Sequence, residues 1–204
     1  MNKNEPPRWV TNIIHTCMGL QRGEKIIFIM DEPLSHARNA LLTEAAKASP
    51  SELWSYTFPN AARPFSEYPP QLLTTATQMD VVVILLASLD HVKEHPALHA
   101  AVQTIIKSNA RTGLGAFIDQ SILDCELSAD YEQIAAFSSA LAEQLRGSSS
   151  ARVTTALGTD LRMSLVGREW KTDTGILRGQ NVFGNLPAGE TYIAPIEDSA
   201  EGLL

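Results

Sequence analysis

The sequence has few of the residues that mark specialised classes of protein. Two cysteines among 204 residues are too few for a disulfide scaffold, and Cys17 and Cys125 show no metal-binding spacing. Sixteen basic residues against 23 acidic ones give a net charge of −7, whereas nucleic-acid binding requires a basic patch. We therefore expect a globular protein of the reducing cytoplasm, with no nucleic-acid partner.

Long apolar runs are also lacking. The longest, residues 81–87, is far too short to span a bilayer, and the N-terminal stretch MNKNEPPRW is polar with no apolar segment behind it. These features predict no membrane partner and no export signal. The sequence contains no G-x-S-x-G, H-E-x-x-H or phosphate-loop motif, so the common short signatures of hydrolases and nucleotide-binding enzymes do not apply.

Strand and helix patterns alternate regularly over residues 1–148. Continuous apolar runs predict buried strands, and apolar residues at helical spacing predict helices. The expected strands are 25–31, 52–58, 81–88 and 113–119, and the expected helices are 9–20, 33–48, 69–79, 97–108 and 129–146. This alternation predicts an α/β fold: a three-layer N-terminal domain with a mostly parallel sheet.

The pattern changes after the small, polar stretch 147–150. Residues 151–165 alternate between apolar and polar and predict a β-hairpin that turns around residues 158–160. A further strand is expected at 191–198, with no helix before it. We therefore predict a second domain, 149–204, as the β-rich start of a truncated domain with little core of its own.

Two motifs in the first domain could bind a ligand. Gly113-x-Gly115 lies in or just before a strand, whereas a dinucleotide-binding fingerprint follows a strand and opens a helix. His91, His95 and His99 are spaced four apart, so a continuous helix would place all three on one face for a metal ion. Pro96 interrupts that spacing, and a loop that caps the following helix is the simpler interpretation.

The stretch GNLPAGETYIAP, residues 184–195, places one carboxylate where a turn leads into an apolar strand. Pro187 and Gly189 make the turn rigid, and Glu190 opens the strand. A carboxylate held in this way suits a hard or borderline cation. Taken alone, a single carboxylate does not establish a metal site, and the nearby Asp160 and Asp173 are explained as ordinary turn residues.

Several stretches together resemble the thermophilic aminopeptidase family, also called aminopeptidase T. They are RVTTALGTDLRMSLVGREWKTDTG (152–175), GNLPAGETYIAP and EDSAEG (197–202). The resemblance implies a metal-dependent aminopeptidase with a peptide substrate, a homodimer, and two divalent ions, of zinc, cobalt or manganese. It implies that Glu190 is a metal ligand. It also implies architectural roles for Gly158, Asp160, Asn185, Pro187 and Gly189.

The sequence departs from the family's pattern in its remaining ligands. In that family a second glutamate, a histidine and a His-x-Asp pair come from strands downstream, whereas this sequence ends at Leu204 and its five histidines all precede residue 100. We therefore expect the N-terminal portion of a longer enzyme, inactive by itself and without an assignable catalytic residue. Two other hypotheses remain: a ring-cleaving, non-haem iron dioxygenase on the same scaffold, and a non-catalytic module that binds a peptide or protein.

Overall fold

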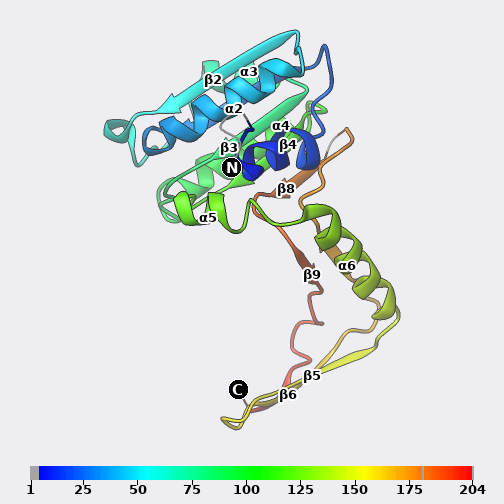
Figure 1. The fold of residues 1–204 in the computed structure, drawn as a ribbon. Coiled ribbons are helices and arrows are strands. Elements are labelled where there is room, and N and C mark those ends of the chain that lie inside the picture. The colour runs from blue at the N-terminus through cyan, green and yellow to red at the C-terminus, as the bar shows by residue number, and fades with distance from the viewer. Residues whose placement is uncertain (1–4, 181, 204) are drawn as a thin grey trace. The chain divides into compact units, whose positions relative to one another are not determined.

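The computed structural model describes residues 5–180 and 182–203 (Figure 1). The chain forms two compact units, each assembled from two segments. Unit 1 comprises Met1–Glu132 and Gly175–Ala188, and unit 2 comprises Gln133–Thr174 and Gly189–Leu204. The predicted boundary near residue 148 falls inside unit 2, and the division into domains 1–148 and 149–204 stays a prediction.

A five-stranded sheet with the order β2-β1-β3-β4-β8 forms the centre of unit 1. All four of its strand pairs are parallel. Its strands are β1 (Lys25–Asp31), β2 (Glu52–Phe58), β3 (Val81–Leu85), β4 (Arg111–Gly115) and β8 (Phe183–Asn185). The bounds predicted for β1 and β2 are confirmed. The fourth strand begins and ends earlier than the predicted 113–119, and the three-residue β8 is too short for its sequence to reveal.

Helices cover both faces of this sheet. Successive side chains of a strand point to opposite sides, so each strand contributes apolar side chains to the packing on both faces. Ile26 and Phe28 of β1 belong to one apolar cluster, and Ile27 and Ile29 belong to another. The first cluster includes residues of α1 (Arg8–Thr11), η1 (Asn12–Cys17), η2 (Glu32–Leu34), α2 (Ser35–Lys47) and α5 (Gln120–Asp124). The second includes residues of α3 (Pro70–Ala76) and α4 (His95–Ile106), while η3 (Asn60–Ala62) follows β2. The predicted three-layer α/β fold is confirmed.

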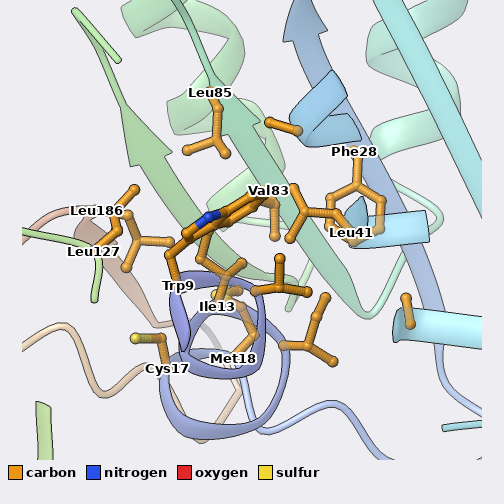
Figure 2. Packing of buried hydrophobic residues seen from close by; sticks show 14 of the residues in the cluster. Trp9, Ile13, Cys17, Met18, Phe28, Leu41, Val83, Leu85, Leu127 and Leu186 are labelled. Atoms are coloured by element: carbon orange, nitrogen blue, oxygen red, sulfur yellow. The ribbon is translucent and has the colours of Figure 1, made fainter. Parts of the chain in front are cut away.

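The first apolar cluster is drawn in Figure 2. Trp9 and Ile13 of the N-terminal helical segment lie against the sheet beside Val83 of β3. Cys17 is part of this core, and its burial raises the pKa of the thiol to about 12, so it packs as a small apolar group rather than reacting as a thiolate. Cys125 is exposed.

Unit 2 has little comparable packing. It consists of most of α6 (Tyr131–Gln144), a three-stranded antiparallel sheet and a two-stranded one. The strands are β5 (Ser150–Thr154), β6 (Asp160–Ser164) and β10 (Glu201–Leu203) in the larger sheet, and β7 (Lys171–Asp173) and β9 (Glu190–Tyr192) in the smaller. The predicted hairpin is formed by β5 and β6. Among the described hydrophobic side chains of unit 2, Leu165 alone is fully buried.

Within residues 5–180 and 182–203, no helix has the length and apolar character needed to cross a bilayer.

Candidate functional site

The stretch 184–190 connects the parallel sheet of unit 1 to the small sheet of unit 2. Gly184 and Asn185 are the last two residues of β8, where they pair with β4. The next residue, Leu186, is fully buried, and its N–H donates to the Leu114 carbonyl at 2.9 Å. The stretch is thus anchored in the core of unit 1 only four residues before Glu190.

The Gly113-x-Gly115 motif is explained by this anchor and not by a nucleotide. A Cβ atom at Gly113 would lie 2.5 Å from Cδ1 of Leu186, and one at Gly115 would lie 2.2 Å from the Leu186 carbonyl oxygen. At Gly115 the clash is with backbone, so this position requires glycine for close approach of the 184–186 segment, whereas at Gly113 the buried Leu186 side chain would have to move. The motif lies in β4, as the sequence predicted, and its glycines leave space for the segment that contains Leu186.

Glu190 itself begins β9 in unit 2, and its side chain is exposed. Gly189, immediately before it, has φ +144°, a conformation that side-chain-bearing residues rarely adopt. After it, the Thr191 hydroxyl donates to the Ser138 carbonyl of α6 at 3.1 Å. The orientation of Glu190 is therefore set by a glycine turn on one side and a helix contact on the other.

A second carboxylate faces Glu190 across the small sheet. β7 and β9 pair antiparallel, and Asp173 is the residue directly opposite Glu190. Directly opposed side chains have Cβ atoms about 5 Å apart, and like charges in such a pair repel. The sequence did not reveal this pair, because sixteen residues separate the two carboxylates and Asp173 was interpreted as a turn residue.

The two carboxylates can contribute to a metal site but do not complete one. A divalent ion held by protein side chains alone takes three or four ligands, and a two-metal site takes more. Residues 5–180 and 182–203 bring together no group of three histidine, cysteine, aspartate or glutamate side chains that could hold an ion. The ligand set present in this chain therefore does not fit the two-metal centre that the resemblance implies.

Asp160, expected to be an architectural residue, is the first residue of β6 and lies next to the hairpin turn. Its two carboxylate oxygens accept hydrogen bonds from Nε and an Nη of Arg152, both at 2.7 Å. This interaction lowers the pKa of Asp160. The side chain thus ties β6 to β5 as an exposed ion pair. The turn itself contains Gly158 at φ +108°.

A second candidate site lies in unit 1, where the strands of the parallel sheet end. The chain runs from β1 outward to β2 and then returns to β3 on the other side of β1. The carboxyl ends of β1 and β3 therefore form a topological switch point, the usual place for a ligand in an open α/β sheet. A pocket of about 390 Å³ lies here, lined by Arg63, Ser88, Leu89, Asp90 and Phe117 among others.

A buried ion cluster of Asp31, Arg63 and Glu94 lies at this edge of the sheet, and two of its members line the pocket. Arg63 forms ion pairs with both carboxylates, which are 3% and 1% exposed, and donates to the Ser88 carbonyl at 2.5 Å. Its guanidinium also lies 5.2 Å from the centre of the Phe65 ring. The cluster joins the end of β1, the segment after β2, the loop after β3 and the start of α4, so it holds the edge in one shape.

The two carboxylates of this cluster have their pKa values shifted in opposite directions. Burial raises the pKa of Asp31, although Arg63 and the backbone N–H groups of Ala87 and Ser88 oppose the shift. Burial also acts to raise the pKa of Glu94, but hydrogen bonds from Arg63 and from two backbone N–H groups outweigh it and lower that pKa. Both Nη atoms of Arg63 donate to these partners, so its charge is already paired with two carboxylates.

The three histidines with four-residue spacing lie beside this edge. Their rings form a continuous row on the exposed side of α4 and the turn before it, with ring centres 6.0 and 5.9 Å apart. As the sequence indicated, a helix starts near Pro96, since α4 begins at His95 and a capping turn precedes it. That turn nevertheless keeps the three rings in one row. His15 and His36 lie elsewhere in unit 1, where they contact Glu44 and Gln120.

No protein-family model matches the sequence, and no curated protein matches it either. Solved structures share its fold, among them the following two. Wild-type AmpT from Thermus thermophilus aligns with a TM-score of 0.69 and 15% identity, over 96% of this chain and 62% of that one. The 2,5-dihydroxypyridine dioxygenase from Pseudomonas putida KT2440 aligns with a TM-score of 0.67 and 17% identity, over 95% of this chain and 57% of that one.

These identities establish a common fold and not a common activity. AmpT is an aminopeptidase T, so the resemblance noted in the sequence corresponds to a distant structural relationship. The dioxygenase aligns equally well, and neither activity is favoured by the alignment. The chain spans about three fifths of the length of each of the two proteins.

Proposed function

We propose that this chain contributes the α/β domain and the first metal ligand of a metal-dependent aminopeptidase. Glu190 is the ligand, and the observation that supports it is its placement: a glycine turn anchored by buried Leu186 delivers an exposed carboxylate opposite a second one, Asp173. Carboxylate oxygens on adjacent strands are donors that a divalent cation binds. The choice of an aminopeptidase rests on the fold shared with AmpT and on the resemblance of residues 152–202 to the aminopeptidase T family.

The remaining ligands would come from residues that this sequence does not contain. AmpT is longer than this chain, which aligns with 62% of it, so a continuation of the polypeptide has room for a second glutamate, a histidine and a His-x-Asp pair. When bound, the ions would polarise the scissile carbonyl of a peptide and activate water. The residues of this chain would hold Glu190 in position. A homodimer and a cytoplasmic location stay predictions.

The structural match to the dioxygenase favours a second candidate, a ring-cleaving oxygenase that acts on a hydroxylated heteroaromatic ring. Non-haem iron oxygenases commonly use two histidines and one carboxylate. The β7–β9 pair presents two carboxylates, one more than such an iron site takes. We therefore place the peptidase first and keep the oxygenase as the alternative.

Two assays on the native gene product separate these activities. The first follows release of N-terminal residues from short peptides after metal removal and after addition of Zn²⁺, Co²⁺ or Mn²⁺. The second follows oxygen uptake with 2,5-dihydroxypyridine and Fe²⁺. We expect metal-dependent release that Glu190→Gln reduces by about 10²-fold or more, because a ligand is lost. Glu197→Gln, a nearby exposed glutamate paired with Arg168, should leave it unchanged. Oxygen uptake without peptide cleavage would reverse the assignment.

A further inference from the structure

The row of histidines in unit 1 has a local structural cause. Asp90 begins the helical turn: its side-chain Oδ1 accepts from the backbone N–H groups of Val92 and Lys93, both at 3.0 Å, as a helix cap does. The carbonyl of Asp90 accepts from Glu94 N–H at 2.8 Å, and that of Glu94 accepts from Leu98 N–H at 2.9 Å. Helical hydrogen bonding therefore runs from Asp90 into α4.

Pro96 is compatible with this arrangement because it lies in the first turn of α4. The first N–H groups of a helix have no partner within the helix, so a proline there loses little and its φ angle is already suitable. The four-residue spacing of His91, His95 and His99 consequently does place them on one face. Their rings have centres 6.0 and 5.9 Å apart and are tilted by 37° and 16°.

All three imidazoles are exposed, whereas Glu94 between them is 1% exposed and is turned inward to Arg63. Phe117 extends the row at its N-terminal end, with its ring centre 5.6 Å from that of His91. Phe117 has φ +60°, an uncommon conformation for an aromatic residue, and its ring is half exposed. The row therefore has an apolar end at Phe117 and an open end at His99.

We propose that this row is a binding site for one divalent transition-metal ion such as Zn²⁺, Ni²⁺ or Cu²⁺. Imidazole nitrogen is the ligand these ions prefer among neutral side chains. An ion about 2 Å from one nitrogen of each of two rings requires ring centres roughly 5 Å apart. The observed spacing is within about 1 Å of that distance, and exposed side chains reach it by small rotations about χ1 and χ2.

The row provides two chelating pairs that share one residue. His91–His95 and His95–His99 each offer two nitrogens, and water completes the coordination, since the described residues of the chain bring no third ligand to either pair. Two charged side chains lie at the row's start, the Asp90 carboxylate and the Lys93 ammonium, 3.9 Å apart. Hydrogen bonds from the Lys93 and Val92 backbone lower the pKa of Asp90, so the carboxylate stays ionised and partly offsets the positive end of the helix.

This site is independent of Glu190, which belongs to the other unit and to the proposed peptidase centre. The sharing of His95 gives the site a distinctive response to substitution. His95→Ala removes both pairs, and so does the double variant H91A/H99A, whereas His91→Ala or His99→Ala alone removes one pair and keeps the other.

Titration of the 204-residue chain with Zn²⁺ and with Cu²⁺, followed by calorimetry at neutral pH, tests the proposal. We expect one ion per chain, with the dissociation constant raised about twofold by either single end variant, since one of two pairs remains. His95→Ala and H91A/H99A should raise it roughly tenfold or more, because a chelating ligand is lost. Glu190→Gln and His36→Ala should leave it unchanged.

Circular dichroism of each variant verifies that these exposed substitutions leave the fold intact. Paramagnetic broadening by Cu²⁺ should then affect the ring resonances of His91, His95 and His99 and spare those of His15 and His36. The proposal is overturned if the wild-type chain binds neither ion below millimolar concentration. Binding that persists unchanged in His95→Ala would overturn it equally.

Discussion

The two units of this chain differ in how much of their structure they specify for themselves. Unit 1 contains two apolar clusters on opposite faces of a parallel sheet, and most of its strand residues are fully buried. Unit 2 has one fully buried hydrophobic side chain among its described residues, and Leu157, Val166 and Leu203 are largely exposed. Hydrophobic burial is the main stabilising term in folding, so unit 1 carries the stability of the chain.

The well-packed unit 1 is therefore the supporting scaffold, and the candidate metal ligand belongs to the weakly packed unit 2. The 184–186 segment is held in unit 1 by close packing against two glycines, and the exposed Glu190 follows immediately in the weakly packed unit. A ligand whose orientation depends on few contacts becomes fixed when a cation or further residues order it. The comparison therefore predicts large effects from changes in unit 1 and small ones in unit 2.

The largest effect is expected from Arg63→Ala in unit 1. The substitution leaves Asp31 and Glu94 buried without their cation, which costs about 3–5 kcal/mol of unfolding free energy. Urea denaturation at pH 7 measures it. Arg8→Ala, which removes an exposed pair with Asp130 at 3.6 Å, should cost about 1 kcal/mol or less. Equal losses in the two variants would refute the structural role of the cluster.

The same variant should alter the dependence of stability on pH. In the wild type, the lowered pKa of Glu94 adds stability that is present above its unfolded pKa, about 4.3, and lost as pH falls through the folded value. The raised pKa of Asp31 acts in the opposite sense. Without Arg63 both pKa values rise, so the cost of Arg63→Ala, measured as the loss of unfolding free energy relative to the wild type, should increase as pH rises from about 4 to 7. A cost that stays constant or shrinks over this range would contradict the account.

Two leucines with the same burial sharpen the comparison directly. Leu85→Ala in β3 removes a fully buried side chain from the first apolar cluster and should cost about 2–5 kcal/mol. Leu165→Ala in unit 2, where the side chain is 1% exposed but has few buried neighbours, should cost about 1 kcal/mol, because a loosely packed site collapses around the gap. Similar costs would show that unit 2 has a core of its own.

A smaller effect is expected at the proposed metal ligand. In the metal-free chain Glu190 is an exposed carboxylate at the start of β9, so Glu190→Gln should change the unfolding free energy by no more than about 0.5 kcal/mol. Glu201→Gln offers a matched control, because Glu201 lies opposite Arg162 and its loss should lower stability slightly. Thermal melts of both variants in the presence of a chelator measure these effects, and a clearly destabilised Glu190→Gln chain would show that the carboxylate serves the fold.

The smallest effect is expected from Arg152→Ala on the exposed hairpin of unit 2. The pair with Asp160 is half exposed on both sides and is screened by water, so the melting temperature of the chain should not change measurably. Thermal melts of Arg152→Ala and of the wild type, in low and in high salt, test this prediction. A clear loss of stability that high salt abolishes would assign the hairpin a larger share of the fold than its exposure suggests.

The sequence predicted the parts of the fold that local patterns encode. Continuous apolar runs located β1 and β2 to the residue, and the alternation of strands and helices gave the three-layer architecture. The short strand β8 escaped prediction, because three residues carry no periodicity and their pairing with β4 depends on glycines seventy residues away. Long-range pairing of this kind leaves no local signal.

The same limit applies to the candidate site. The sequence singles out Glu190 from its turn, and its role as a ligand stays a prediction, whereas the opposed Asp173 depends on the register of two strands separated by a long loop. At the histidine row the sequence indicated a loop capping a helix that starts near Pro96, and α4 does begin at His95. The alignment of the three rings was not predicted, because it depends on the geometry of the turn before the helix. The cap that starts the turn, Asp90, could have been found from its position ahead of the row.

The most direct test of the central claim is the mass and metal content of the native gene product, measured in a His95→Ala background so that the histidine row does not contribute. We predict a product heavier than the 22.2 kDa of this chain that retains at least one divalent ion, and the further substitution Glu190→Gln should remove that ion. A 22.2 kDa product without metal, or a metal content that Glu190→Gln leaves unchanged, would contradict the proposal that Glu190 is a ligand of a metallopeptidase centre.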